Sequence, residues 1–451
     1  MYECAKLLIC ILVRNALMTE VLVFSKHSTP RLRYTLDWVL SNRLGLNYKI
    51  TDSESEFISY PHAKINYGNT TLTNFFTIEC TTILYETSIN ENFGEIGEWD
   101  GLKTFFKTSG KEVPFDIFGA VFYCISRMEE YGINTLDSHE RYSPSNSILF
   151  KLGVLSTPLV DWWLVQFKKV FSSFFPLLQF KSETYRLTNT FDIDQAFCYV
   201  GKGFYRTLGG LCKDFWRLDF RRIKERIEVL SGFKKDPYDT FEYILQQQKD
   251  HALNTIVFIL LADYSTYDKN ITRDNTRFKQ RMKQLQADTI LGIHPSYFSG
   301  TSPSRIKMEI KRLVDVQRMP VTHSRQHYLR FVLPDTFRLL VDSGIRHEYS
   351  LGYAEVVGFR AGTSHSFHWF DIEKNESSSL EMHPSCVMDV TLKNYLLLSP
   401  DRAVEKLRTL IEEVKKVNGT FLPIWHNESI SNHGEWGGWR EVYESMLEIK
   451  K

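Results

Sequence analysis

The feature that most constrains the fold is an alternation of apolar strands and amphipathic helices that starts near residue 185 and continues toward the C-terminus. Its first members are strands at 185–193, 255–262 and 288–295 and helices at 237–252, 276–286 and 303–317. Such alternation predicts parallel strands that are joined by helical crossovers. We therefore expect one large α/β domain over residues 183–451.

The first part of the chain has a different pattern and predicts a second, smaller domain. A strand, a helix and a strand are expected between residues 19 and 65, and long helices at 114–132 and 157–175. A chain of 451 residues is also longer than an average domain, which independently favours two domains. We expect an N-terminal α/β and helical domain over residues 1–175, followed by a linker that ends near residue 186.

Composition and charge limit the classes of partner and compartment. The 55 Lys and Arg residues balance 54 Asp and Glu residues, so the net charge of +1 gives no field that would gather nucleic acid. The seven cysteines are scattered and never form a C-x-x-C pair, which argues against disulfides and favours a reducing, cytoplasmic location. The apolar start contains Glu3 and Arg14 and no small-residue cleavage site, so we expect no export signal. Translation from Met18 would make the leading residues an artefact.

Polar residues with catalytic potential follow several expected strands. Asp192 and Asp194 end the first strand, His294 ends the third, Arg360 ends V-V-G-F-R, and His426 ends F-L-P-I-W-H. Each is weak evidence alone, because a lone histidine or an acid-x-acid pair also occurs in ordinary capped loops. In barrels of alternating strands and helices, however, reactive residues gather where the C-terminal strand ends meet the following loops. We expect these side chains to converge on one mouth.

The order of these residues resembles the motif series of a known family. The run T-F-D-x-D, H-P-S, G-F-R-A-G and L-P-I-W-H is similar to the motifs of the polysaccharide deacetylases. This carbohydrate esterase group includes chitooligosaccharide and peptidoglycan deacetylases. The resemblance covers residues 187–451 and implies a distorted (β/α) barrel of the glycoside hydrolase/deacetylase superfamily. Segments at 116–132, 324–331, 350–363 and 425–431 also resemble a bacterial subgroup with an extra N-terminal domain, often linked to surface polysaccharide synthesis.

The resemblance implies a role for each motif residue. Asp192 corresponds to the general base, Asp194 and His294 to metal ligands, Arg360 to the residue that holds the base, and His426 to the general acid. The implied reaction is metal-dependent removal of acetyl groups from a saccharide, N-acetyl more than O-acetyl. A divalent ion would activate water and polarise the carbonyl group. An imidazole that titrates near neutrality suits protonation of the leaving group.

One position departs from the family pattern. The second motif usually supplies two histidines four residues apart, but the second of these positions is Phe298. We expect His327 to supply the third metal ligand, with His323, His365 and His368 as weaker candidates. Carboxylate and imidazole ligands favour zinc, or else cobalt, nickel or iron, over magnesium.

Aromatic residues near the motifs are candidates for contact with a sugar. Trp425, Trp436 and Tyr297 are our candidates, because a pyranose ring can stack on an aromatic side chain. The alternative is that the tryptophans only pack the end of the barrel. Residues 213–230 are basic and aromatic, which suits contact with a membrane surface. The plainer interpretation is a helix that covers the barrel with a charged, solvated side.

Two other functions fit parts of the sequence. Because Phe298 replaces a ligand, the chain is also compatible with a catalytically inactive deacetylase fold that binds glycans or supports a polysaccharide-synthesis complex. A phosphoryl-transfer enzyme could use Asp192 and Asp194 with magnesium. That chemistry would need an activating lysine and a second carboxylate pair, and the sequence offers no convincing pair.

Overall fold

The computed structural model describes residues 19–68, 72, 74–132 and 135–449. The predictions about an export signal and about the start at Met18 concern residues outside these ranges. Among the described residues, no helix combines the length and the apolar character that crossing a membrane would require.

The N-terminal part contains a small parallel sheet with the strand order β2-β1-β3-β4. Its strands are β1 (Glu20–Phe24), β2 (Asn47–Thr51), β3 (Lys64–Tyr67) and β4 (Thr77–Ile78), and β5 (Gly97–Trp99) pairs with β6 (Leu102–Thr104). The helices are α2 (Pro30–Leu36), α3 (Glu54–Ser59), α4 (Ile117–Ile125), α5 (Ile148–Lys151) and α6 (Leu159–Phe174). Strand β1 is apolar from Val21 to Phe24, as suits a strand that lies between two neighbours and is buried on both faces.

The rest of the chain forms a ten-stranded sheet with the order β12-β13-β11-β10-β9-β8-β7-β16-β14, and β15 pairs with β7. The strands are β7 (Arg186–Ile193), β8 (Asn254–Ile259), β9 (Ile290–Ile293), β10 (His323–Ser324), β11 (His347–Glu348), β12 (Phe367–Asp371), β13 (Glu376–Met382), β14 (Val387–Met388), β15 (Thr420–Phe421) and β16 (Pro423–His426). All neighbours are parallel except β12 and β13. The predicted parallel strands are confirmed. Within the described residues the pairings form an open path from β12 to β14, so the structure shows an α/β protein with a mixed sheet, and the distorted (β/α) barrel that we expected is not shown.

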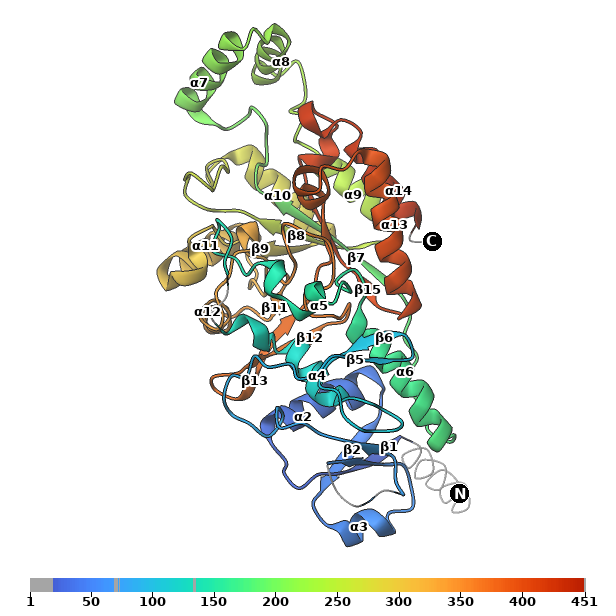
Figure 1. Cartoon of the computed structure of the whole chain (residues 1–451). Coiled ribbons are helices and arrows are strands. Elements are labelled where there is room, and N and C mark those ends of the chain that lie inside the picture. Colours follow the sequence, from blue (N-terminus) through green and yellow to red (C-terminus); the bar gives the residue numbers. More distant parts are fainter. Residues whose placement is uncertain (1–18, 69–71, 73, 133–134, 450–451) are drawn as a thin grey trace, which may run out of the picture.

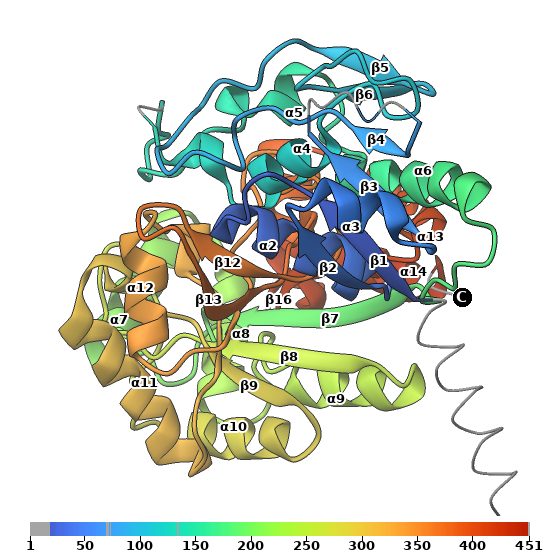
Figure 2. The same ribbon diagram turned by 90° about the horizontal axis from the view of Figure 1, so that it is seen from below.

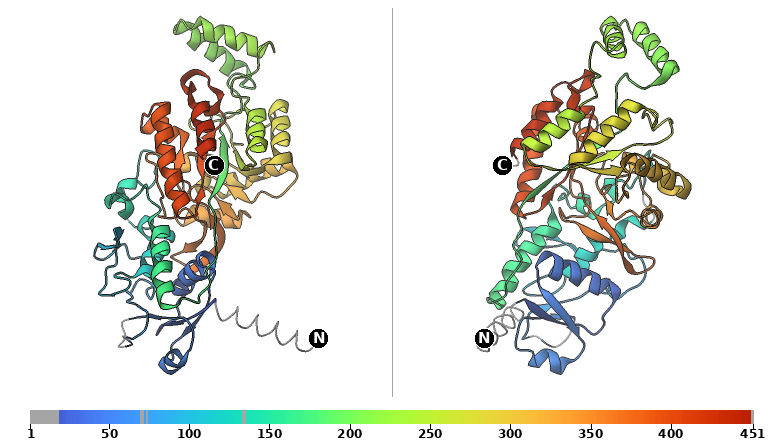
Figure 3. Two further views of the ribbon diagram at one scale, coloured as in Figure 1. Left: turned by 90° about the vertical axis from the view of Figure 1, so that its right-hand side faces the viewer. Right: turned by 180° about the vertical axis from the view of Figure 1, so that it is seen from behind.

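Helices alternate with the strands of this sheet along the chain, and most of them cover its faces. They are α7 (Gly203–Trp216), α8 (Phe220–Leu230), α9 (Phe241–Asp250), α10 (Thr276–Asp288), α11 (Pro303–Gln317), α12 (Asp335–Asp342), α13 (Pro400–Lys416) and α14 (Trp439–Ile449). In the left view of Figure 3, the red helices α13 and α14 lie on one side of β7 and the yellow-green helices α9 and α10 on the other. Ser399 begins α13 by accepting a hydrogen bond from the Arg402 amide, and Pro400 occupies the first turn, where no amide donor is needed.

The segment that leads to Arg360 is not a strand, which corrects our expectation for V-V-G-F-R. Gly358 has a φ of +137°, and a Cβ atom there would lie 2.4 Å from the Leu155 carbonyl oxygen. The Phe359 amide donates to that same oxygen over 2.8 Å. The segment is therefore held between the N-terminal part of the chain and Cys386, whose carbonyl oxygen accepts from the Gly358 amide over 2.8 Å, and it forms no strand.

The two parts of the chain share one hydrophobic core. It includes Val23 and Phe122 from the first part and Phe370 and Leu380 from the large sheet. The blue N-terminal elements lie below this sheet in Figure 1 and nearest the viewer in Figure 2. Asp161 on α6 accepts a hydrogen bond of 2.8 Å from the Ser364 amide, next to β12. The first part of the chain thus packs on the β12–β13 edge of the large sheet.

Candidate metal centre

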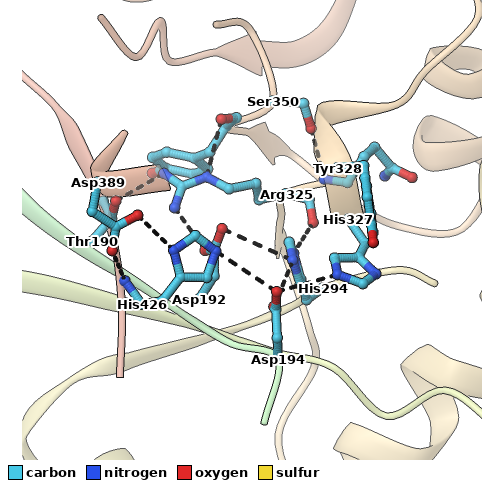
Figure 4. A network of polar contacts seen from close by, with 12 residues as sticks. Thr190, Asp192, Asp194, His294, Arg325, His327, Tyr328, Ser350, Asp389 and His426 are labelled. Atoms are coloured by element: carbon cyan, nitrogen blue, oxygen red, sulfur yellow. Dashed lines mark hydrogen bonds and ion pairs between the residues drawn. The ribbon is translucent and has the colours of Figure 1, made fainter. Parts of the chain in front are cut away.

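Strand pairing brings the ends of β7, β9 and β16 together. In the parallel register, His426 on β16 lies opposite Asp192 on β7. The His294 amide, directly after β9, donates to the Ile259 carbonyl at the end of β8. Asp194 lies two residues beyond Asp192. The C-terminal ends of adjacent strands therefore carry these four polar side chains to one edge of the sheet (Figure 4).

Asp194, His294 and His327 form a group of three potential metal ligands. Their donor atoms all lie within 4.8 Å of one another. The Asp194 Oδ1 atom is 3.2 Å from His294 Nε2, and the Oδ2 atom is 3.2 Å from His327 Nε2. His327 follows β10 in a short turn, as the order of the strands predicted. The structure thus brings our candidate for the third ligand to the two motif residues.

The other nitrogen of each imidazole already has a partner. His294 Nδ1 donates to the Arg325 carbonyl oxygen over 2.6 Å, which leaves Nε2 facing Asp194. His327 Nδ1 lies 2.9 Å from a carboxylate oxygen of Asp268. Such outer partners fix the orientation and tautomer of histidines that bind metals. Both rings are therefore oriented as metal ligands would be.

The Asp194 carboxylate also fits a cation. None of the described residues donates a hydrogen bond to its buried Oδ1 atom, although His294 Nε2 lies 3.2 Å away. Burial alone would raise the pKa of Asp194, but the charge of His327 and its hydrogen bond to Asp194 hold this pKa well below its usual value. Burial would lower the pKa of His327, whereas Asp194 and Asp268 raise it to about 9. These contacts favour positive charge beside Asp194, and one carboxylate with two imidazoles is a donor set suited to zinc.

Arg325, and not Arg360, holds Asp192. Its Nη1 atom donates to Asp192 Oδ1 over 2.8 Å, and its Nη2 atom donates to Thr190 Oγ1 over 2.9 Å. Arg360 instead makes two hydrogen bonds, of 2.8 and 2.6 Å, to Glu130 and one to the Gly352 carbonyl oxygen. We expected Arg360 to hold Asp192, and this expectation is wrong. The segment before Arg360 turns toward the N-terminal part of the chain, so its guanidinium contacts Glu130.

His426 is oriented by Asp389, a residue directly after β14. Asp389 Oδ1 is 2.8 Å from His426 Nδ1, and Oδ2 accepts the His426 amide over 2.7 Å. The His426 Nε2 atom therefore points to the donor group and lies 3.7 Å from Asp194 Oδ2 (Figure 4). Burial would lower the pKa of His426, but the Asp389 charge and hydrogen bond raise it well above its usual value. The protonated ring is thus favoured.

A cavity of about 290 Å³ opens over these residues. Its aromatic lining consists of Tyr267, Tyr328, Tyr395 and Trp436. Trp436, one of our candidates for sugar contact, is therefore part of the wall. Tyr328 has a φ of +62°, a left-handed conformation that is costly for a tyrosine and is often found at functional sites.

The other two candidates for sugar contact lie behind the cavity wall. Trp425 is only 1% exposed, and its indole packs on Tyr443 and donates to the Met446 sulfur. The Tyr297 ring stacks on Tyr267 with a centroid distance of 3.9 Å. Trp425 thus belongs to the core, and Tyr297 supports a cavity residue. Both correct our expectation of direct contact.

The N-terminal part of the chain also contributes to this wall. Arg141 lines the cavity and donates from Nη1 to the Tyr328 carbonyl oxygen over 2.9 Å. Its Nη2 atom donates to the Tyr395 hydroxyl over 3.3 Å. Because Tyr328 follows His327 directly, Arg141 supports the strained turn that carries the third potential ligand.

Residues 21–176 match a protein family described as a family of unknown function, DUF7033. No curated protein matches the chain.

Solved structures with similar folds include a protein assigned to the polysaccharide deacetylases from Mycobacterium smegmatis, with 14% identity and a TM-score of 0.38 over 59% of this chain and 85% of that one. A polysaccharide deacetylase from Bacillus cereus has 11% identity and a TM-score of 0.30 over 59% and 86%. A CE4 family pseudoenzyme from Bacillus anthracis has 10% identity and a TM-score of 0.29 over 59% and 62%. Similarity at this level transfers no chemistry to this chain.

The remaining predicted histidines lie away from the cavity. His365 and His368 line a different cavity, and His323 stacks on His347. A second group of potential ligands, His347, Glu381 and His383, lies on and beside β11 and β13. The first group is the candidate catalytic site because Asp192 and His426 flank it.

Sequence reasoning missed four residues of the site. They are Arg141, Asp268, Arg325 and Asp389. Two had a signal: Arg325 precedes His327 by two positions at the end of a strand, and Asp389 ends C-V-M-D. Asp268 and Arg141 lie in irregular segments, and nothing in their local sequence distinguishes them.

Proposed function

We propose that the chain is a metal-dependent hydrolase that removes acetyl groups from a saccharide, N-acetyl groups in preference to O-acetyl groups. The observation that carries this proposal is the arrangement of three groups around one cavity. The potential ligands Asp194, His294 and His327 are flanked by Asp192 with Arg325 and by His426 with Asp389. These are the parts that acyl hydrolysis needs: a metal site, a base and an acid.

Asp192 and His426 divide the proton transfers. A divalent ion at the three ligands, zinc in our proposal, would lower the pKa of water and polarise the acyl carbonyl. Asp192 takes a proton from the attacking water, and Arg325 keeps its carboxylate in position through Oδ1. His426, protonated and held by Asp389, gives a proton to the departing nitrogen or oxygen. An amine leaves poorly without a proton, so this acid suits an amide substrate.

The cavity wall supports a saccharide as the substrate. Tyr267, Tyr328, Tyr395 and Trp436 offer aromatic faces near the donor group, and Arg141 adds hydrogen-bond donors. We further propose that the saccharide belongs to bacterial surface polysaccharide metabolism and that the chain acts in the cytoplasm.

The decisive experiment couples metal analysis with acetate release. We expect the purified full chain to retain about one zinc ion per molecule and to release acetate from N-acetylated oligosaccharides. His327→Ala should lose the metal and the activity, because it removes a ligand that Asp268 orients. Asp192→Asn should keep the metal and lose at least about a hundredfold in kcat, in the range for a lost acid or base.

His323→Ala provides a matched control, because this histidine lies outside the cavity. Its metal content at the catalytic site and its turnover should stay unchanged. Absence of metal from the protein, or metal that persists in the variant without His327, would contradict hydrolysis at this site. The inactive glycan-binding alternative would then be preferred.

A further inference from the structure

Helices α7 and α8 form a hairpin that projects from the body of the protein (Figures 1 and 3). Residues 202–235 contain it, and it is inserted between β7 and α9. Gly203, the first residue of α7, comes nine positions after Asp194. The hairpin therefore leaves the body at the same end of β7 as the candidate site. This placement contradicts the plainer expectation of a helix that covers the barrel.

The surface of the hairpin is unusually apolar. Ten large apolar side chains in it are between 45 and 89% exposed: Phe204, Tyr205, Leu208, Phe215, Trp216, Leu218, Phe220, Ile227, Leu230 and Phe233. Soluble proteins normally expose such side chains singly, and a contiguous group marks an interaction surface. The group is also rich in aromatic residues, which are favoured at the boundary between lipid and water.

The interior of the hairpin, by contrast, is polar. Arg226 on α8 donates to Asp214 on α7 over 2.6 Å, and the two residues are only 6 and 3% exposed. The guanidinium also lies 4.7 Å from the centre of the Tyr199 ring. A Cβ atom at Gly210 would lie 2.7 Å from Arg226 Nη1, so glycine provides the space for this contact. Although Val229 is also buried, the contact between the two helices is a charged pair while ten large apolar side chains are exposed, which is the reverse of the usual arrangement in water.

The hairpin is also strongly basic. Residues 202–235 contain ten Lys and Arg residues and four Asp and Glu residues. Their net charge of +6 exceeds the +1 of the whole chain, so the remainder carries a net charge of −5. Arg217 and Arg221 are exposed beside Trp216 and Phe220 near the turn. Apolar side chains mixed with basic ones match a surface of lipid tails beneath anionic headgroups.

We propose that the α7–α8 hairpin docks the protein on an anionic lipid surface. The aromatic side chains enter the headgroup boundary, the basic side chains contact the lipid phosphates, and the buried pair of Asp214 and Arg226 keeps the two helices together. This inference is independent of the reaction at the cavity, because it uses none of the catalytic side chains. It also gives the site a defined position close to the membrane.

The test is co-sedimentation of the full chain with vesicles. We expect binding to vesicles of phosphatidylcholine mixed with phosphatidylglycerol, much weaker binding to phosphatidylcholine alone, and a decrease in binding as salt is added. The double variant Trp216→Ser and Phe220→Ser should reduce binding at least about tenfold, because serine gains none of the free energy that an aromatic side chain gains when it leaves water. Arg217→Gln with Arg221→Gln should reduce binding to the anionic vesicles about tenfold or more, and less to phosphatidylcholine.

Leu177→Ser with Leu397→Ser is the matched control. These leucines are 74 and 80% exposed but lie outside the hairpin, so this variant should bind vesicles like the parent chain. An equal loss in this control would show non-specific adsorption and would overturn the proposal. Failure of the parent chain to bind vesicles would also overturn it. If the Trp216 and Phe220 double variant instead dissociated an oligomer in light scattering, the hairpin would be a protein interface.

Discussion

Arg325 connects Asp192, the proposed general base, to the interior of the sheet. The side chain is fully buried, and its Nε atom donates to the Tyr349 carbonyl oxygen while Nη1 reaches Asp192. Its guanidinium lies 4.4 Å from the centre of the Phe258 ring. Because a guanidinium is planar and its donors are fixed, these contacts determine where the Asp192 carboxylate lies.

Replacing Arg325 and Arg360 by lysine separates the two arginines. Arg325→Lys cannot keep both the Asp192 and the Thr190 contacts, so kcat should decrease about a hundredfold, as expected when a reacting group is misplaced. The metal content should stay unchanged. Arg360→Lys should mainly lower the thermal midpoint, because it loses contacts to Glu130. A large loss of kcat in the Arg360 variant at unchanged stability would restore our original assignment.

His426 and Asp389 should behave as one unit. His426→Ala and Asp389→Asn should both decrease turnover of N-acetyl substrates by at least about a hundredfold. The decrease should be much smaller for acetate esters of phenols, whose leaving groups depart without a proton. Steady-state rates for paired amide and ester substrates provide the measurement. Equal losses on both substrates would mean that His426 positions the substrate and does not protonate the leaving group.

The sequence predicted the potential metal ligands better than it predicted the residues that orient the site. Asp194, His294 and His327 could be grouped because each follows a strand, and parallel strands end at one edge. The choice between Arg325 and Arg360 depended on a backbone turn at Gly358 that faces Leu155, a contact between distant segments. No pattern within one segment reports such a contact.

At the scale of elements, buried charges link the segment after α4 to the segment that carries Arg360. Glu130 pairs with Arg127 on its own segment and with Arg360 across the contact between the two parts of the chain. Burial alone would raise the pKa of Glu130, but Arg360 and Arg127 hold it below its usual value. The carboxylate form is therefore the one that stabilises the folded chain.

Glu130→Gln should destabilise the protein at neutral pH by roughly 3 to 5 kcal/mol, the cost of leaving a buried charge without its partner. The depressed pKa means that this stabilisation is present above the unfolded pKa of about 4.3 and is lost as the pH falls through the folded value. The parent chain and the variant should therefore become more alike in stability toward acid pH. Urea unfolding at several pH values measures the difference, and a constant gap would contradict this role.

The long elements of the fold were predictable, whereas the short ones were not. Helices α11 and α13 begin at Pro303 and Pro400, as the serine–proline pairs indicated. Strands β10, β11 and β14 have two residues each, too few for a period to be seen. The antiparallel pair β12–β13 escaped notice because an expected strand before it made the parallel pattern look continuous.

On the scale of the whole molecule, the N-terminal part both covers a sheet edge and lines the cavity. A fragment that begins at Ser182 would expose the β12–β13 face and would lose Arg141 and Glu130. We expect this fragment to aggregate, or to bind zinc much more weakly than the full chain. Cleavage of the intact protein at a protease site inserted beside Leu177, which is exposed, should instead leave the two pieces associated and active. Comparison of the two by gel filtration and zinc titration tests the prediction.

The cavity over the three ligands holds about 290 Å³, near the lower end of the range of about 300 to 1,000 Å³ for small-molecule sites. If the chain is the proposed hydrolase, this space accommodates little more than one sugar ring. The neighbouring rings of a polymer would then extend into solvent. The enzyme would then be insensitive to the degree of polymerisation, and kcat/KM should change little between a disaccharide and a hexasaccharide. The deacetylated units would be scattered along the polymer, with no run of consecutive modified units.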